Sequence, residues 1–407
     1  QFHELKRALC RAYKHVPFYR ALWARYGIQP DDIRTLSDIR KLPIISKQFF
    51  LQHRMEDIMH ESYPPGGFVW KQTSGSTGEP FRFPSSARHY FFYRFGGGCG
   101  GAHSLLFLAW RGISPRYACE HMRIAEIRVS RSWSPQFLHI DVSDFRDRPE
   151  EAVRRLEEFR PDIVNARATI LVELARVSAS IPPAERPRMR YVVSHGEVVT
   201  PSQRKYVHEV LGAELYDRYG LEEVGSIALD CHKHNGLHIH EESFVVEVLD
   251  AEGNILPEGT EGRIVITFFY NDVMPFIRYD TGDRGKIIAE PCECGIPARR
   301  IFVDGRRGGF LNIGSKRFNN VEFEMFLCHY SGSVLRHQLA KVGADKVELR
   351  IVPAKNFSDG SAAILQNEFR QKFGFKPKIR VVNHIPYTQS GKTRFIVDET
   401  AILTNEE

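Results

Sequence analysis

A run of small and hydroxyl-bearing residues early in the chain has the chemistry to bind the phosphates of a nucleotide. The run is Thr73-Ser74-Gly75-Ser76-Thr77-Gly78. Its glycines can adopt positive φ values and let a ligand approach the backbone closely, and its hydroxyls and N–H groups can form an anion-binding nest. The spacing excludes a Walker A loop, which needs G-x-x-x-x-G-K-[ST]. Taken alone, the run indicates either a polyphosphate-binding loop or a flexible surface linker.

Cysteine and histidine residues form a second group, with the chemistry of a metal site. Cys231 opens a histidine-rich stretch, and Cys292 and Cys294 follow it after the expected hairpins. Three thiolates and one imidazole suit a closed, tetrahedral, structural Zn²⁺ site, and His238 and His232 are the candidate imidazoles. The alternative is a pair of reduced surface cysteines beside a histidine-rich loop. The chain has 7 cysteines, and their odd number and irregular spacing argue against a disulfide framework.

Helices and strands in a regular order must position these groups. Residues 1–60 are expected to be mainly helical, and a strand at 68–70 enters the loop. From residue 149 an alternation of helices and strands predicts parallel pairing: helices at 149–160 and 201–211, and strands starting at 163, 191 and 214. Between 237 and 287 the pattern changes to hairpins, with strands at 244–249 and 264–269. Near the end, strands at 347–352 and 379–382 flank a helix at 362–373.

The stretch Gly305-Arg306-Arg307-Gly308-Gly309 is charged, rich in glycine and poor in apolar residues, so a flexible domain boundary is expected there. The predicted fold class is α/β. A large N-terminal α/β domain, with parallel sheets and a hairpin-rich β region, covers 1–304. A small mobile C-terminal α+β domain covers 305–407.

Composition narrows the classes of partner. The net charge is +6, from 56 basic and 50 acidic residues in 407, and the basic residues are scattered, whereas a nucleic-acid-binding protein concentrates them on one face. No apolar run approaches the ~18 residues of a membrane span. The first residues indicate an amphipathic helix rather than a signal peptide. We therefore expect a cytoplasmic protein without nucleic-acid or membrane partners.

Four further segments follow the hydroxyl-rich loop in a fixed order. They are Ser194-His195-Gly196-Glu197, Tyr219-Gly220-Leu221-Glu222-Glu223-Val224-Gly225, Arg278-Tyr279-Asp280-Thr281-Gly282-Asp283 and Pro386-Tyr387-Thr388-Gln389-Ser390-Gly391-Lys392. In this order and spacing the chain resembles the adenylate-forming superfamily of acyl-CoA synthetases and peptide-synthetase adenylation domains. The Arg-Tyr-Asp-Thr-Gly-Asp motif and the Cys-X-Cys pair are most similar to those of the phenylacetate–CoA ligase branch. The resemblance spans nearly the whole chain.

The resemblance implies a two-step reaction. ATP and a small carboxylic acid give an acyl-adenylate and pyrophosphate, and the acyl group then passes to an acceptor thiol, usually of coenzyme A. An amine or a carrier-protein thiol is the alternative acceptor, and a homodimer is a further candidate assembly. A different class of function is also open, namely a zinc-stabilised binding protein on a retired enzyme fold.

The resemblance also implies roles for individual residues. The loop 73–78 holds the β- and γ-phosphates, and Glu223 with Thr77 holds Mg²⁺, a hard cation that prefers oxygen ligands. Lys392 reaches the acyl and α-phosphate oxygens when the small domain closes. Cys231, His238, Cys292 and Cys294 are the implied zinc ligands. The remaining nucleotide contacts are Gly196, Glu197, Tyr219, Gly220, Asp283 and Arg306.

Each of three residues also has a purely structural alternative. Tyr219 could fill the core, Asp283 could be a turn residue, and Arg306 could be a solvated charge. An aromatic stretch, Tyr90–Phe95 beside Gly96–Gly98, favours an aryl or compact cyclic acid, although aromatic residues at this spacing also fill cores.

Three positions depart from the pattern of relatives. Glu79 stands where a basic residue is common, Glu222 where threonine is usual, and Gly308 where an acidic hinge residue is common. These departures motivate the alternative of a weakly active or retired enzyme.

Overall fold

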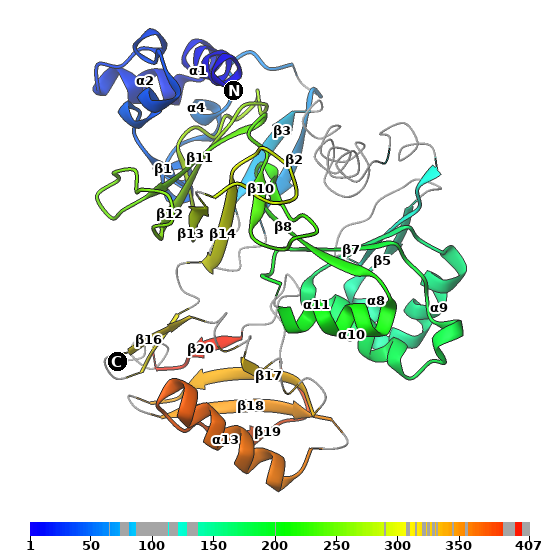
Figure 1. Ribbon diagram of the computed structural model, residues 1–407. Coiled ribbons are helices and arrows are strands. Elements are labelled where there is room, and N and C mark those ends of the chain that lie inside the picture. Colours follow the sequence, from blue (N-terminus) through cyan, green and yellow to red (C-terminus); the bar gives the residue numbers. More distant parts are fainter. Residues whose placement is uncertain are drawn as a thin grey trace. The chain divides into compact units, whose positions relative to one another are not determined.

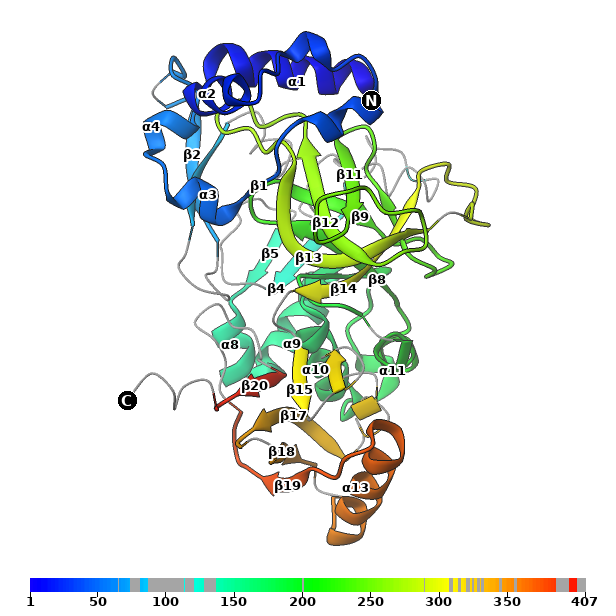
Figure 2. The same cartoon turned by 90° about the vertical axis from the view of Figure 1, so that its left-hand side faces the viewer.

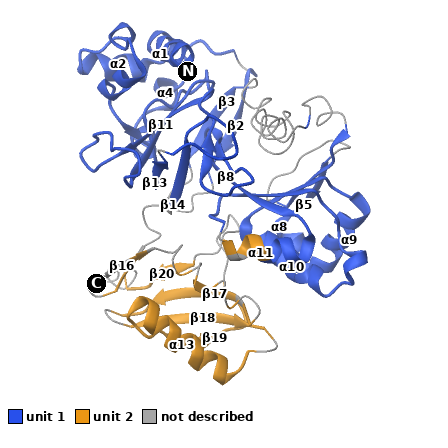
Figure 3. Ribbon diagram, in the orientation of Figure 1, with its two compact units in different colours: residues 1–199, 206–304 blue, residues 200–205, 305–407 orange. Residues whose placement is uncertain are grey.

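The computed structural model describes the chain as two compact units. It describes residues 1–64, 66–73, 81–86, 113, 121–127, 137–199, 201–288, 290–306, 310–313, 316–319, 323, 326–327, 330, 333–343, 346–354, 357–385 and 395–400. Unit 1 comprises 1–199 and 206–304, and unit 2 comprises 200–205 and 305–407 (Figure 3).

Helices dominate the start of unit 1, as expected. They are α1 (Phe2–His15), α2 (Pro17–Arg25), α3 (Lys47–Leu51) and α4 (Met55–Ile58), with short 3-10 turns η1 (Pro30–Asp32) and η2 (Leu36–Lys41) (Figure 1). Pro17 begins α2 because the first helical position needs no N–H donor. The buried residues of α1 share a core cluster with residues of β11 and β12, and α1 contacts β12 directly. Figure 2 shows the helix next to these strands.

A mixed sheet forms the centre of unit 1, in the order β11-β12-β13-β14-β10-β9-β8-β7-β6-β4-β5, with β1 paired to β13. Its strands are β1 (Ile45–Ser46), β4 (Ile124–Ile127), β5 (Phe137–Ile140), β6 (Ile163–Ala166), β7 (Tyr191–His195), β8 (Glu214–Leu221), β9 (Gly225–Leu229), β10 (Leu237–Ile239), β11 (Phe244–Leu249), β12 (Gly262–Phe268), β13 (Tyr279–Ile288) and β14 (Arg300–Arg306).

The parallel and hairpin regions expected from the sequence are both present, and they form a continuous sheet. Strand β8 joins them, because it pairs in parallel with β7 and antiparallel with β9. The strands from β5 to β8 are parallel, whereas β11, β12 and β13 are antiparallel.

Helices α8 (Val142–Asp147), α9 (Pro149–Phe159), α10 (Ala168–Ala179) and α11 (Pro201–Leu211) belong to the parallel half (Figure 1). Leu156 of α9, Leu174 of α10 and Val207 of α11 share a buried cluster with Val164 and Val192 from the strands. These strands carry apolar residues on both faces, as strands covered on both sides do.

Unit 2 contains a sheet of order β19-β18-β17-β20 and the helix α13 (Asp359–Phe373). The strands are β17 (Val334–Lys341), β18 (Val347–Pro353), β19 (Lys378–Val381) and β20 (Ile396–Asp398), and a hairpin of β15 (Phe310–Ile313) and β16 (Lys316–Asn319) precedes them. Ser358 caps the N-terminus of α13, and Gly374, at φ 82°, ends it. Leu365 and Phe369 pack on Leu349 and Ile351.

Strand β14 continues through Gly305 and Arg306, the first two positions of the stretch where a flexible domain boundary is expected. Glycine weakens a strand without forbidding it, so the ladder prevails over local composition. Residues 307–309 lie outside the described residues.

Candidate functional site

The base of the hydroxyl-rich loop is closed by two hydrogen bonds. The Thr73 N–H donates to the Phe81 carbonyl, and the Phe81 N–H donates to Thr73 Oγ1, both at 2.9 Å. These residues extend the hairpin of β2 (Phe68–Gln72) and β3 (Arg82–Ser86). The structure therefore positions the two ends of the loop. The residues between them, among them Ser74, Gly75, Ser76, Thr77, Gly78 and Glu79, lie outside the described residues.

Lys71 connects this hairpin to the turn that follows β8. Its Nζ donates to the Glu222 carbonyl at 2.6 Å and lies 3.9 Å from Glu222 Oε2. The lysine side chain is only 12% exposed. Glu222, one of the three departures from the pattern of relatives, thus has an ion-pair partner in this chain. Lys71 is not among the residues that the motifs single out; the available signal is a lysine in the strand that enters the loop.

Two tyrosine–carboxylate hydrogen bonds join the segments 219–225 and 278–283. The Tyr219 hydroxyl donates to Asp283 Oδ2 at 2.9 Å, and the Tyr279 hydroxyl donates to Glu223 Oε1 at 3.2 Å. All four side chains are buried. Strands β14, β10 and β9 lie between β13 and β8 in the sheet, so the two segments meet across the core that contains both tyrosines.

These hydrogen bonds orient the carboxylates of Asp283 and Glu223. Asp283 is acceptor-only when ionised, which suits ribose hydroxyls, and Glu223 offers the hard oxygen that Mg²⁺ prefers. Tyr219 is 9% exposed and belongs to the hydrophobic core. Its ring therefore fills core space while its hydroxyl holds Asp283, and its role beside adenine stays a prediction.

Side chains of the Arg-Tyr-Asp-Thr-Gly-Asp motif shape the backbone before Asp283. Thr281 Oγ1 donates to the Ile264 carbonyl at 2.9 Å and accepts from the Asp283 N–H at 3.1 Å. Asp280 accepts from the Gly282 N–H at 3.0 Å and pairs with Arg263 at 3.2 Å. Gly282 has φ +77°, a conformation that glycine adopts without strain. The motif thus holds its last residue through its own side chains.

Arg278 anchors the start of the motif to the N-terminal region. Its guanidinium donates to both oxygens of Glu247, at 3.1 and 2.9 Å, and to the carbonyls of Arg40 and Leu42, at 3.1 and 2.6 Å. Arg278 and Glu247 are almost fully buried, with 3% and 4% of their side chains exposed. Burial raises the pKa of Glu247, and Arg278 opposes that rise.

The segment Ser194-His195-Gly196-Glu197 lies at the end of β7, which closes at His195. Gly196 has φ +72° and is exposed, which lets a ligand approach its backbone. Glu197 Oε2 accepts from the Thr169 N–H and hydroxyl, both at 2.9 Å, in the first turn of α10. Glu197 therefore has a structural contact, and its role toward the nucleotide stays a prediction. A Cβ at Gly220 would lie 2.4 Å from the Gly225 carbonyl oxygen, so the tight β8–β9 turn requires glycine there.

The four expected zinc ligands lie together. The ligand atoms of Cys231, His238, Cys292 and Cys294 are all within 4.8 Å of one another. The Cys231 and Cys292 sulfurs are 3.7 Å apart, and Cys294 Sγ is 3.2 Å from His238 Nε2. A tetrahedron with Zn–S bonds of ~2.3 Å has S···S edges of about 3.8 Å, so this group fits zinc. The other candidate imidazole, His232, is exposed.

Neighbouring contacts orient this cluster. His238 Nδ1 lies 3.0 Å from the Ala298 carbonyl, an acceptor, so Nδ1 carries the proton and Nε2 presents its lone pair to the cysteines. Arg300 donates to the carbonyls of Asn235 and Glu290 and so ties together the two loops that carry the ligands. Burial raises the pKa of the Cys231 thiol, a cost that a bound cation would offset. None of the four cysteines that the structure describes forms a disulfide.

Besides the loop residues 74–78, two further expected site residues lack described side chains. Arg306 lies in β14, where only its backbone is described, and Lys392 falls in 386–394, outside the described residues. The acyl-pocket stretch Tyr90–Phe95 with Gly96–Gly98 and the departure at Gly308 also fall outside.

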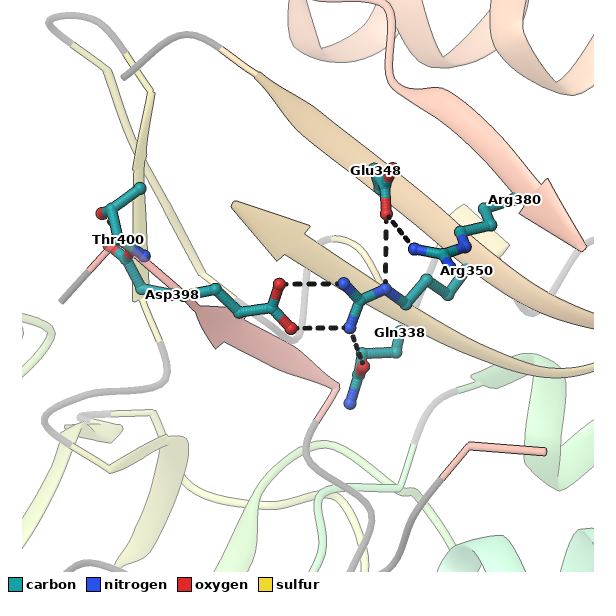
Figure 4. Close-up of polar contacts among 7 residues, drawn as sticks. Gln338, Glu348, Arg350, Arg380, Asp398 and Thr400 are labelled. Carbon is teal, nitrogen blue, oxygen red and sulfur yellow. Dashed lines mark hydrogen bonds and ion pairs between the residues drawn. The ribbon is translucent and has the colours of Figure 1, made fainter. Parts of the chain in front are cut away.

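The chain leaves the Lys392 segment into a well-anchored strand, β20. This strand pairs in parallel with β17, and Arg350 of β18 donates to both oxygens of Glu399 at 2.8 and 2.9 Å. Arg350 also contacts Gln338 at 3.3 Å and Glu348 at 3.5 Å, and Arg380 pairs with Glu348 at 3.4 Å (Figure 4). This network attaches the C-terminal side of the Lys392 segment to the sheet of unit 2.

Known proteins resemble the chain over nearly its whole length. Residues 315–399 match the family described as the CapK C-terminal domain. The chain is 24% identical to a phenylacetate-coenzyme A ligase of Aromatoleum evansii, over 98% of this chain and 93% of that protein. It is 27% identical to a phenylacetate-coenzyme A ligase of Thermus thermophilus, over 88% of this chain and 81% of that protein.

A solved structure shares the fold. It is 2-hydroxyisobutyryl-CoA ligase in the postadenylation state in complex with R3-HIB-AMP, with a TM-score of 0.82 and 17% identity over 99% of this chain and 90% of that chain. The near-complete coverage by the relatives, the ordered motifs and the common fold agree with one another. They support a likeness of this chain to the adenylate-forming superfamily and, within it, to the phenylacetate–CoA ligase-like branch.

Proposed function

We propose that the protein is an AMP-forming acid–thiol ligase that activates a small carboxylic acid with ATP and passes the acyl group to coenzyme A. The observation that carries the proposal is the meeting of three motifs in unit 1. Lys71 ties the base of the hydroxyl-rich loop to Glu222. The hydrogen bonds from Tyr219 to Asp283 and from Tyr279 to Glu223 join the segments 219–225 and 278–283. The relatives that span the chain are named phenylacetate-coenzyme A ligases.

In the first step an oxygen of the carboxylate attacks the α-phosphorus of ATP. The bond from that phosphorus to the α–β bridging oxygen breaks, and pyrophosphate leaves with the electron pair. The loop 73–78 would hold the β- and γ-phosphates, Asp283 the ribose and Tyr219 the adenine. Glu223 and Thr77 would hold Mg²⁺, which neutralises phosphate charge when bound. Lys392 would stabilise the negative charge that develops at the α-phosphate.

In the second step the sulfur of coenzyme A attacks the acyl carbonyl carbon. The bond to the phosphate oxygen breaks, AMP leaves, and the thiol proton passes to solvent. Rotation of the small domain about residues 305–309 between the steps is the kind of gating motion that many enzymes use. An aryl or compact cyclic acid is the favoured substrate, because aromatic residues and glycines follow the loop in sequence.

ATP–pyrophosphate exchange with a panel of carboxylic acids tests this function. We expect exchange that depends on one class of acid, and thioester formation when coenzyme A is added. Exchange without a thioester would favour an amine or carrier-protein acceptor. Tight ATP binding with no exchange for any acid would favour a binding protein on a retired enzyme fold.

Zinc is proposed as a structural cofactor held by Cys231, His238, Cys292 and Cys294. We expect about one equivalent of zinc in the purified protein. Cys292→Ser should weaken metal affinity by at least the ~10–100-fold that loss of a ligand's hydrogen-bond partner costs, and it should lower the melting temperature. Cys10→Ser is the control, because Cys10 is an exposed cysteine far from the cluster in sequence. Zinc below half an equivalent in the wild type, with an unchanged melting temperature in Cys292→Ser, would contradict the proposal.

Two further expectations stay predictions, a cytoplasmic location and a homodimer. Within the described ranges, every helix is too short or too polar to cross a membrane.

A further inference from the structure

We propose that Tyr279 is a positioning residue for Glu223, and that its hydroxyl gives the enzyme its affinity for the magnesium form of ATP. The inference rests on the proposed function, in which Glu223 holds Mg²⁺. Its starting point is the hydrogen bond from the Tyr279 hydroxyl to Glu223 Oε1, at 3.2 Å. A phenol supplies a hydrogen bond without charge, so it orients the carboxylate while leaving it anionic for a cation.

Glu223 needs an external partner because it lies in a turn. The turn connects β8, which ends at Leu221, to β9, which begins at Gly225. Lys71 holds the backbone of this turn through the Glu222 carbonyl. That contact leaves the Glu223 side-chain torsions to be set by what the carboxylate touches. Tyr279, reaching the turn from β13, is a side chain that contacts the carboxylate directly.

Tyr279 is itself held on several sides. It is 3% exposed, and its ring packs against Phe50, with ring centres 6.0 Å apart, and Phe276, at 5.1 Å. Its backbone pairs with Ile45 of β1, and the preceding residue is the buried Arg278. A ring packed in this way cannot swing to another rotamer without displacing core side chains. The hydroxyl is therefore a fixed donor, and the carboxylate adjusts to it.

Removing the Tyr279 hydroxyl should affect only the binding of ATP that carries Mg²⁺. Loss of a hydrogen-bond partner behind a metal ligand costs about 10–100-fold in metal affinity. Removing the Tyr279 hydroxyl should therefore weaken binding of ATP with Mg²⁺ by that factor. Binding of ATP without metal should stay unchanged, because the nucleotide contacts proposed for the loop, Tyr219 and Asp283 do not involve Tyr279.

Tyr19 provides a matched control. It is also a buried tyrosine of the same core, and its hydroxyl donates to the Pro275 carbonyl at 2.6 Å and accepts from the Ile277 N–H at 3.2 Å. Tyr279→Phe and Tyr19→Phe therefore each remove one buried hydroxyl near the same segment, and Tyr279→Phe removes the one that contacts Glu223.

The experiment is calorimetric titration of each protein with ATP, in excess Mg²⁺ and in chelator. We expect Tyr279→Phe to lose about 10-fold or more in affinity with Mg²⁺ only, and Tyr19→Phe to keep the wild-type ratio of the two affinities. In a Glu223→Gln background, Tyr279→Phe should cause no further loss. Equal losses with and without Mg²⁺, or the same loss in the Glu223→Gln background, would reduce Tyr279 to a structural role. A wild-type protein that binds no ATP in either condition would instead overturn the proposed function, and the role of Glu223 with it.

Discussion

Replacing Lys392 with alanine is expected to slow acyl-adenylate formation by about 10²–10³-fold, the cost of removing one group that stabilises transition-state charge. A carboxylate anion must approach a triphosphate that is already negative. Glu79 stands where relatives often carry a basic residue, so the loop lacks that positive charge and the demand on Lys392 is larger. β20, which follows the Lys392 segment, is anchored to the sheet of unit 2 through Arg350 and Glu399.

The measurement is ATP–pyrophosphate exchange with the active acid, followed by transfer to coenzyme A from supplied acyl-adenylate. The transfer step makes no new bond at phosphorus, so we expect it to fall far less than exchange. Lys376→Ala is the control, because it removes the same charge from an exposed position in the same unit. Full exchange activity in Lys392→Ala would refute the proposed mechanism.

Replacing Arg278 with methionine is expected to lower the free energy of unfolding by about 3–5 kcal/mol, the usual cost of breaking a buried ion pair from one side. The change leaves Glu247 buried without its partner and removes the donors to the carbonyls of Arg40 and Leu42. Both residues have a Cβ, so the positive φ of 46° at this position costs the same before and after. Urea unfolding measures the difference.

Two comparisons make this prediction specific. Arg7→Met breaks an exposed pair with Glu4 and should cost at most about 1 kcal/mol. A second replacement, Glu247→Leu, in the Arg278→Met protein should recover part of the loss, because it removes the buried acid. A loss in Arg278→Met no larger than that in Arg7→Met would show that the buried pair does not anchor the motif.

The loss in Arg278→Met should also depend on pH. Burial raises the pKa of Glu247 above its ordinary value of 4.5, and Arg278 opposes that rise. In the variant, burial still raises the pKa of Glu247 but Arg278 no longer lowers it. The folded protein therefore binds the Glu247 proton more tightly than the unfolded chain does. Stability is then gained at low pH and lost as the pH rises through the raised pKa. We expect a smaller difference from the wild type at acid pH than at neutral pH.

Local patterns predicted most elements of the fold. The helix predicted at 201–211 matches α11 (Pro201–Leu211), and the strand at 244–249 matches β11 (Phe244–Leu249). Proline, glycine and apolar periodicity mark such elements because they act within a few residues. The continuity of the sheet through β8 was not predicted, since strand pairing joins residues far apart in sequence.

Motif order, residue type and spacing established from the sequence that the chain resembles adenylate-forming ligases, and they named the four cysteine and histidine residues of the metal cluster. The ligand chemistry of zinc restricts the candidates to few residue types, which is why that group was accessible from sequence alone. The contacts of Lys71 with Glu222, of Tyr279 with Glu223 and of Arg278 with Glu247 emerged only from the fold. Each joins segments that lie far apart along the chain, and a buried hydrogen bond depends on distances that only the packed core sets.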